Sequence, residues 1–230
     1  MLAALYDHLG PGISPGHDTR TPPVASFVVV DHILLDVISA FRESLEGALL
    51  EQQAVEERFQ VDVFLGDVSF ETSYSLPGEQ QPPRVRVDIG LEWPTWSQSA
   101  YRSWSIGEPP SEQPEVVVEV TLRLQRLAVA PDRTAVLSVL GNTGPSIAGE
   151  PLSRGGVTVE HGYDDDEAAP SFALDITYQG ALKLTEPLLE EPNRLDDQLR
   201  PLGGWVASAL VRLADLDLPF LPTGGPGASA

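Results

Sequence analysis

Residues 85–93 have the sequence Val85-Arg-Val-Asp-Ile-Gly-Leu-Glu-Trp93. Every second side chain is apolar, and the positions between them hold arginine, aspartate, glycine and glutamate. Successive side chains of a strand point to opposite faces, so this alternation predicts a strand with one buried face and one charged face. Residues 116–124 repeat the pattern, with valine or leucine at every even position. The two segments therefore predict two half-buried strands.

Shorter segments with the same period lie on both sides of this pair. Apolar residues occupy odd positions over residues 61–65 and even positions after Gly66-Asp67, and this change of phase predicts a bulge or a tight turn. Further strands are predicted over residues 134–140, 157–161, 172–178 and 181–184, with clusters of glycine, proline and aspartate between most of them. Strands that follow one another without intervening helices predict an antiparallel sheet.

Segments with the spacing of a helix precede and follow the predicted strands. Over residues 31–57 the predicted N-cap is Asp31, and one face carries Leu34, Ile38, Phe41, Leu45 and Leu49. A second helix is predicted from Pro201, which suits a first turn, with one face formed by Leu202, Val206, Ala209, Leu210 and Leu213. The predicted fold class is α+β, with a long N-terminal amphipathic helix and a shorter C-terminal helix packed on a bent, multi-stranded antiparallel sheet.

The predicted organisation is a Gly/Pro-rich arm over residues 1–25, a single α+β domain over residues 26–220 and a flexible Gly/Pro tail over residues 221–230. The order of a long helix and a curved antiparallel sheet is similar to that of tubular lipid-binding folds. This resemblance is one of element order only, and it implies a carrier of an apolar ligand such as a lipid.

Composition narrows the classes of partner. The chain of 230 residues has 34 acidic and 14 basic residues, a formal net charge of −20. Such a surface repels phosphate backbones and anionic membranes, so we expect no nucleic-acid partner. No apolar segment has the length of a membrane span, and the N-terminus lacks the pattern of a signal peptide. The predicted location is cytoplasmic or within an assembly.

Catalytic and cofactor motifs are not recognisable. The chain has no cysteine, which excludes disulfides and thiolate chemistry. Gly12-Ile-Ser-Pro-Gly16 matches the nucleophile-elbow string, but Pro15 lacks the N–H that the oxyanion hole needs. The sequence also lacks the glycine-rich loops that bind nucleotides, so no cofactor is predicted. The four histidines, none with metal-ligand spacing, are His8, His17, His32 and His161.

The densest charge run is Asp164-Asp165-Asp166-Glu167. Consecutive carboxylates often contribute to calcium sites, but the alternating spacing of a calcium loop is missing. We predict a solvated loop between two strands, with opportunistic calcium binding as the alternative.

An unusual aromatic segment follows the first quoted strand. Three of the four tryptophans lie within twelve residues, together with a tyrosine and an arginine: Trp93, Trp96, Tyr101, Arg102 and Trp104. Aromatic side chains with an arginine are enriched in protein interfaces. The alternative is that Trp93 ends a strand and the other rings close one end of the core.

The leading functional hypothesis is a non-catalytic interaction protein, a subunit of a larger assembly that binds a protein partner or itself. The second hypothesis is a carrier of an apolar small molecule, in a cavity between the long helix and the sheet. The third is a hydrolase that uses a pair of carboxylates, for which the sequence names no pair.

Overall fold

A computed structural model describes residues 25–50, 55–64, 66–77, 82–141, 143–162 and 171–221. The helices are α1 (Ala25–Leu50), α2 (Thr95–Ser105), α3 (Arg133–Leu140), α4 (Glu186–Glu190) and α5 (Pro192–Ala214). The strands are β1 (Val55–Phe64), β2 (Asp67–Ser75), β3 (Val85–Trp93), β4 (Glu115–Leu127), β5 (Thr143–Ile147), β6 (Glu150–Gly162) and β7 (Ser171–Lys183). The predicted arm up to residue 24 and the tail from residue 222 lie outside the described residues.

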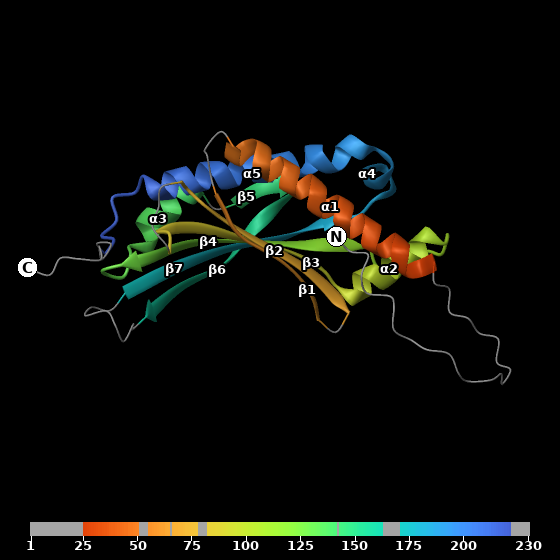
Figure 1. Cartoon of the computed structure of the whole chain (residues 1–230), viewed down its shortest axis with the longest axis horizontal. Helices are drawn as coiled ribbons and strands as arrows, with labels where there is room; N and C mark the ends of the chain where they lie inside the picture. Colours follow the sequence, from red (N-terminus) through yellow and green to blue (C-terminus); the bar gives the residue numbers. More distant parts are fainter. Residues whose placement is uncertain are drawn as a thin grey trace, which may run out of the picture.

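The strands form one seven-stranded sheet with the order β1-β2-β3-β4-β7-β6-β5, and all neighbours are antiparallel. Figure 1 shows the twisted sheet below the helices α1 and α5. The α+β class and the antiparallel sheet predicted from the alternating segments are confirmed. Because the connections within β1–β4 and β5–β7 join adjacent strands, most of the sheet is a meander.

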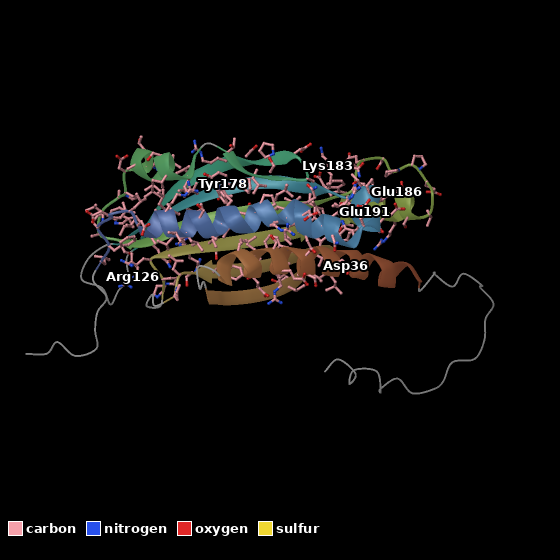
Figure 2. The ribbon with its side chains drawn as sticks, turned by 90° about the horizontal axis from the view of Figure 1, so that it is seen from above. Asp36, Arg126, Tyr178, Lys183, Glu186 and Glu191 are labelled. Atoms are coloured by element: carbon pink, nitrogen blue, oxygen red, sulfur yellow. The ribbon has the colours of Figure 1, made fainter. Side chains whose placement is uncertain are left out.

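The core lies between the sheet and the helices α1 and α5, which run side by side over it (Figure 2). From β3 and β4 the alternating apolar side chains point into this layer, and residues such as Val87 and Val120 are fully buried. Helix α1 contributes Val37, Phe41 and Leu45, each with no exposed surface. The rings of Phe41 and Phe70 meet edge to face at 6.2 Å. One apolar cluster therefore joins both layers.

Both long helices have boundaries that differ from the prediction. Helix α1 begins before Asp31, the predicted N-cap, and the strand β1 already starts at Val55. Helix α5 begins at Pro192, so Pro201 lies inside it instead of in its first turn. The apolar spacing continues backwards from Leu202 through Leu199 and Leu195, both buried, and this burial outweighs the cost of an exposed internal proline.

Two shorter segments also differ. Residues 134–140 were expected to form a strand because they are rich in valine and leucine, but they form helix α3. The Asp132 side chain accepts a 2.9 Å hydrogen bond from the Thr134 N–H and so caps this helix, while Val136 and Leu140 point into the core one turn apart. The predicted strands over residues 172–178 and 181–184 are one strand, β7. The phase change at Gly66-Asp67 is a tight turn, in which Gly66 has a φ of 96°.

Among the described residues, no helix combines the length and the apolar character that crossing a bilayer requires.

The helices α1 and α5 are in close backbone contact at Gly203. A Cβ atom at this position would lie 2.5 Å from the Ser44 carbonyl oxygen of α1. At the next residue, Gly204, a Cβ would meet no atom within 4 Å. Only hydrogen fits at Gly203, so this glycine sets the spacing of the helical layer.

We expect Gly203→Ala to destabilise the protein by about 1–3 kcal/mol, because the methyl group forces the two helices apart. The matched control is Gly204→Ala, which should raise the stability by up to about 1 kcal/mol, because alanine is the better helix former and the site is open. Chemical unfolding of both variants measures the two free energies. Equal effects of the two substitutions would contradict the close approach.

Candidate binding surface

The sheet has a second face, opposite to α1 and α5, on which polar side chains gather. Antiparallel partners in register share a face, so the strand pairing aligns side chains in rows across the sheet. One row contains Ser73, Asp88, Thr121 and Thr177, and its two threonine hydroxyls lie 3.2 Å apart. We call this polar side of the sheet the open face.

The next row crosses the whole sheet and includes a glycine. Glu71 of β2 pairs with Gly90 of β3, which pairs with Glu119 of β4. Beyond Glu71 the row contains Gln60 of β1, and beyond Glu119 it continues through Gln179 of β7 to Ser153 of β6 and Thr143 of β5. Strands are spaced by about 4.8 Å, so the Cα atoms of the two glutamates are about 10 Å apart. Two carboxylates therefore flank a position that has no side chain.

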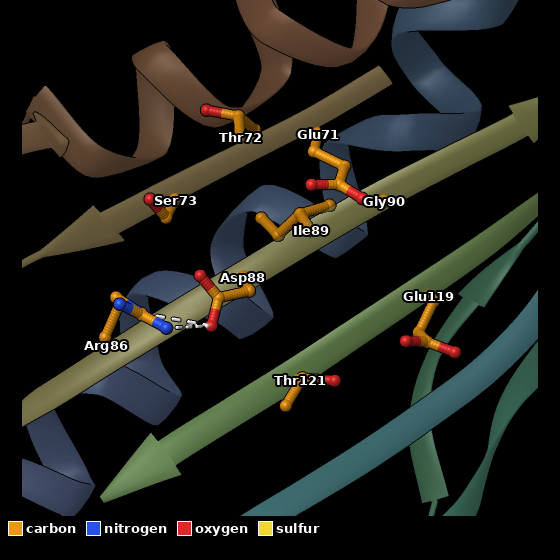
Figure 3. A pocket seen from close by; sticks show the side chains of 9 residues that line it. All are labelled: Glu71, Thr72, Ser73, Arg86, Asp88, Ile89, Gly90, Glu119 and Thr121. Atoms are coloured by element: carbon orange, nitrogen blue, oxygen red, sulfur yellow. Dashed lines mark hydrogen bonds and ion pairs between the residues drawn. The ribbon is translucent and has the colours of Figure 1, made fainter. Parts of the chain in front are cut away.

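The missing side chain leaves a depression in the open face. Two adjoining hollows of about 260 and 160 Å³ both include Glu71, Gly90 and Glu119 in their lining. Figure 3 shows the larger one, with the Glu71 side chain beside Gly90 and Glu119 on the far side of the strand. We call the two hollows the acidic groove and define it by Glu71, Ser73, Asp88, Gly90, Glu92 and Glu119.

Arginines of the open face are held by neighbouring carboxylates. Arg86 forms an ion pair with Asp88 at 3.0 Å. Arg123 donates to Asp175 and to Glu160, each at 2.7 Å. Burial raises the pKa of Asp175, and Arg123 opposes that shift. The Gly90 row contains no basic residue, and the Glu119 carboxylate accepts a 2.6 Å hydrogen bond from the Gln179 amide of the same row.

This arrangement suits a cationic ligand that is longer than a single ion. The two hollows are partly open to solvent and adjoin across β2, β3 and β4, which allows an extended chain to lie across the strands. Carboxylates at the edge of a low-dielectric surface attract guanidinium and ammonium groups, and a glycine lets a ligand approach the backbone closely. Sequence reasoning missed the groove, because Glu71, Gly90 and Glu119 come together only through the strand register.

The aromatic segment predicted as an interaction patch lies in and around helix α2, and its side chains differ in exposure. Trp93 is fully buried and Tyr101 nearly so, whereas Trp96 is 43% exposed. Tyr101 meets Trp93 edge to face at 5.9 Å and Trp104 at 5.7 Å. Arg102 and Trp104 are half-buried. Most of these rings therefore close one end of the core, and Trp96 is the tryptophan of this segment with the most accessible ring.

Helix α2 is fixed to the sheet by polar contacts at its first turn. The Trp93 Nε1–H donates to the Ser97 Oγ at 3.1 Å, and the Ser97 hydroxyl donates to the Glu115 carbonyl at 2.6 Å. The Thr95 N–H and hydroxyl both donate to the Asp67 carboxylate, at 2.5 and 2.7 Å. Asp67 thus caps α2 from the β1–β2 turn, and these two hydrogen bonds lower the pKa of Asp67.

The other predicted site residues lie only partly within the described part of the chain. The acidic run Asp164-Asp165-Asp166-Glu167 lies outside the described residues. His161 is exposed on β6 and stacks on the Phe172 ring at 4.6 Å. Within the described part of the chain, no group of three or more histidines or carboxylates is placed to hold a metal ion.

Comparisons with known proteins find no matching family model, no matching curated protein and no matching solved structure.

We expect Asp67→Asn to lower the melting temperature at neutral pH, because the amide accepts weaker hydrogen bonds from Thr95 than the carboxylate does. The pKa of Asp67 is lower in the folded state, so its stabilising effect is complete above the unfolded pKa of about 3.9 and is lost as the pH falls through the folded pKa. The difference between wild type and variant should therefore shrink below about pH 4.

The control for this pH series is Asp217→Asn, at an exposed aspartate that caps no helix. Its melting temperature should follow that of the wild type throughout the series. A constant difference between wild type and Asp67→Asn down to pH 2 would contradict the role of the Asp67 charge.

Acrylamide quenching tests the exposure of the aromatic segment. Trp96→Phe should remove the largest share of the quenchable fluorescence, because the Trp96 ring is accessible and the Trp93 ring is buried. Trp104→Phe, at a half-buried ring, should remove a smaller share. Quenching that stays unchanged in Trp96→Phe would show that this ring is covered in solution.

Proposed function

We propose that the protein is a non-catalytic subunit of a larger assembly, and that it binds a basic segment of a protein partner in the acidic groove. The observation that carries this proposal is the Gly90 row, in which Glu71 and Glu119 flank a hollow in an otherwise half-buried sheet face. A ligand with arginine or lysine side chains complements both carboxylates at once.

The charge of the whole chain supports the same class of partner. A net charge of −20 accelerates encounters with cationic partners and slows those with anionic ones. The groove adds the specificity that net charge lacks, because its lining combines Glu71 and Glu119 with Arg86, whose charge is paired with Asp88. Trp96 and Ile106, which is 72% exposed, offer additional apolar contact area near one end of the sheet.

A carrier of an apolar ligand remains the alternative that element order suggests. Such a carrier needs a lined cavity between the helices and the sheet. The side chains of Val37, Phe41 and Leu45 fill that layer against the fully buried Val87 and Ile89. Packing of this kind gives the carrier hypothesis no support.

A hydrolase with paired carboxylates is the other alternative, with Glu71 and Glu119 as its pair. The two side chains lie on the same face of the sheet, with a Cα separation of about 10 Å. The two proposals differ in what the loss of one carboxylate does. Removing one carboxylate from a binding site lowers the affinity for the partner, whereas removing one from a hydrolase abolishes the turnover of its substrate.

The test measures the fluorescence anisotropy of a labelled peptide that alternates arginine and glycine. Glu71→Gln and Glu119→Gln should each weaken binding by about three- to tenfold at low salt, and the double variant by more. The effect should fade as salt rises, because exposed charges are screened. Binding that is unaffected by either variant would overturn the groove as the site.

A steric variant tests the hollow independently of charge. Gly90→Val should weaken binding, because its side chain occupies the groove, and should not destabilise the fold, because a Cβ there meets no atom within 4 Å. The matched control is Gly156→Val on β6, which is equally open and lies outside the groove. Equal affinities of the two variants would contradict the proposal.

A further inference from the structure

The two edges of the sheet are unequal. At one edge, β5 has five residues, includes Pro145 and packs against helix α5. A short edge strand with a proline and a covering helix resists pairing with another chain. This edge is therefore protected against pairing with a strand of another chain, as the edges of natural sheets usually are.

Among the residues that the structure describes, none gives the other edge these protections. Strand β1 has ten residues, with no proline and no lysine in its sequence. Among the described elements, β2 is the one that packs extensively against it. The strand order places β1 at the margin of the sheet, at the opposite edge from β5. Every second residue of an antiparallel edge strand directs its N–H and C=O groups away from its neighbour, so β1 presents a row of backbone donors and acceptors.

The side chains of β1 divide between the two faces. Val61 and Val63 pair with Phe70 and Val68 and so lie on the helix side, where they are 49% and 70% exposed. Gln60 and Asp62 pair with Glu71 and Ser69 and lie on the open face. A strand that added to β1 would thus meet exposed valines on one face and acidic side chains on the other.

We propose that the edge of β1 accepts an extended segment of a partner protein, in which apolar side chains alternate with arginine or lysine. This inference rests on the proposed function and adds the edge strand β1 to the binding surface. The backbone of the segment pairs with β1, and its apolar side chains cover Val61 and Val63. Its basic side chains lie on the open face beside Asp62 and reach toward Glu71 of the acidic groove.

Charge favours such a segment over a second copy of this chain. Pairing two β1 strands would bring two acidic open faces together on chains that each carry −20. The sequence of β1 holds three acidic residues and one arginine. Like charges across a strand pair are destabilising, whereas a basic strand offsets the charge on both β1 and the groove.

The experiment uses the full chain and a labelled peptide that alternates arginine and valine, with fluorescence anisotropy as the readout. A second peptide of the same sequence carries N-methyl groups on every second amide, in two versions that block either edge of the strand. Pairing with β1 requires free N–H donors, so the version methylated on the pairing edge should bind about tenfold more weakly or worse. The other version should bind like the parent peptide.

Val63→Lys tests the surface on the protein. The site is 70% exposed, so the substitution leaves the fold intact while it places a like charge against the peptide. The matched control is Val129→Lys, which is 54% exposed and lies after β4. Val63→Lys should weaken binding of the arginine–valine peptide by about tenfold, and Val129→Lys by less than twofold.

The outcomes separate this inference from the proposed function. If both methylated peptides bind like the parent and Val63→Lys has no effect, while Glu71→Gln still weakens binding, the edge is not the site and the groove proposal stands. If neither set of variants matters, both proposals fail. A β1-dependent dimer of the protein that the peptide does not displace would also overturn the inference, because it assigns the edge to a second copy.

Discussion

Burial of the sheet on one side only is the constraint from which the other features of the structure follow. The alternating residues of β3 and β4 send one set of side chains into the layer beneath α1 and α5 and leave the other set on the open face. The helices reach the sheet as a pair because Gly203 lets α5 lie against the Ser44 backbone. At that spacing the helices α1 and α5 cover the apolar face of the sheet. The polar face stays uncovered by them and positions charged groups.

The register of the strands determines which side chains lie next to one another on the open face. Once β2, β3 and β4 are aligned by their apolar faces, Glu71, Gly90 and Glu119 stay on the open face, because a slip of one residue would turn buried side chains outward; the observed register brings them into one row. The stability of the core thus fixes the geometry of the groove. Substitutions in the groove can change binding while the core keeps the strands in place, which is what a binding surface on a rigid scaffold requires.

The sequence predicts the parts of this structure that depend on local periodicity. The strands around Val87 and Val120 and the turn at Gly66 follow from alternation and from the change of phase. The prediction of a strand over residues 134–140 is wrong, because valine favours strands whereas leucine favours helices, and the Asp132 cap is the signal for the helix α3. Helix α2 follows a proline and carries the aromatic segment, whose burial depends on tertiary contacts. Strand order and register depend on distant residues, so neither the groove nor the unequal edges could be predicted.

Amide hydrogen exchange with and without the arginine–valine peptide tests the central claim most directly, namely that the uncovered side and margin of the sheet form the binding surface. The account predicts that peptide addition slows exchange at the amides of β1 that point away from β2, while the amides of β4, β7 and α5 keep their rates. Protection confined to the helices α1, α2 or α5, with β1 unchanged, would contradict the account.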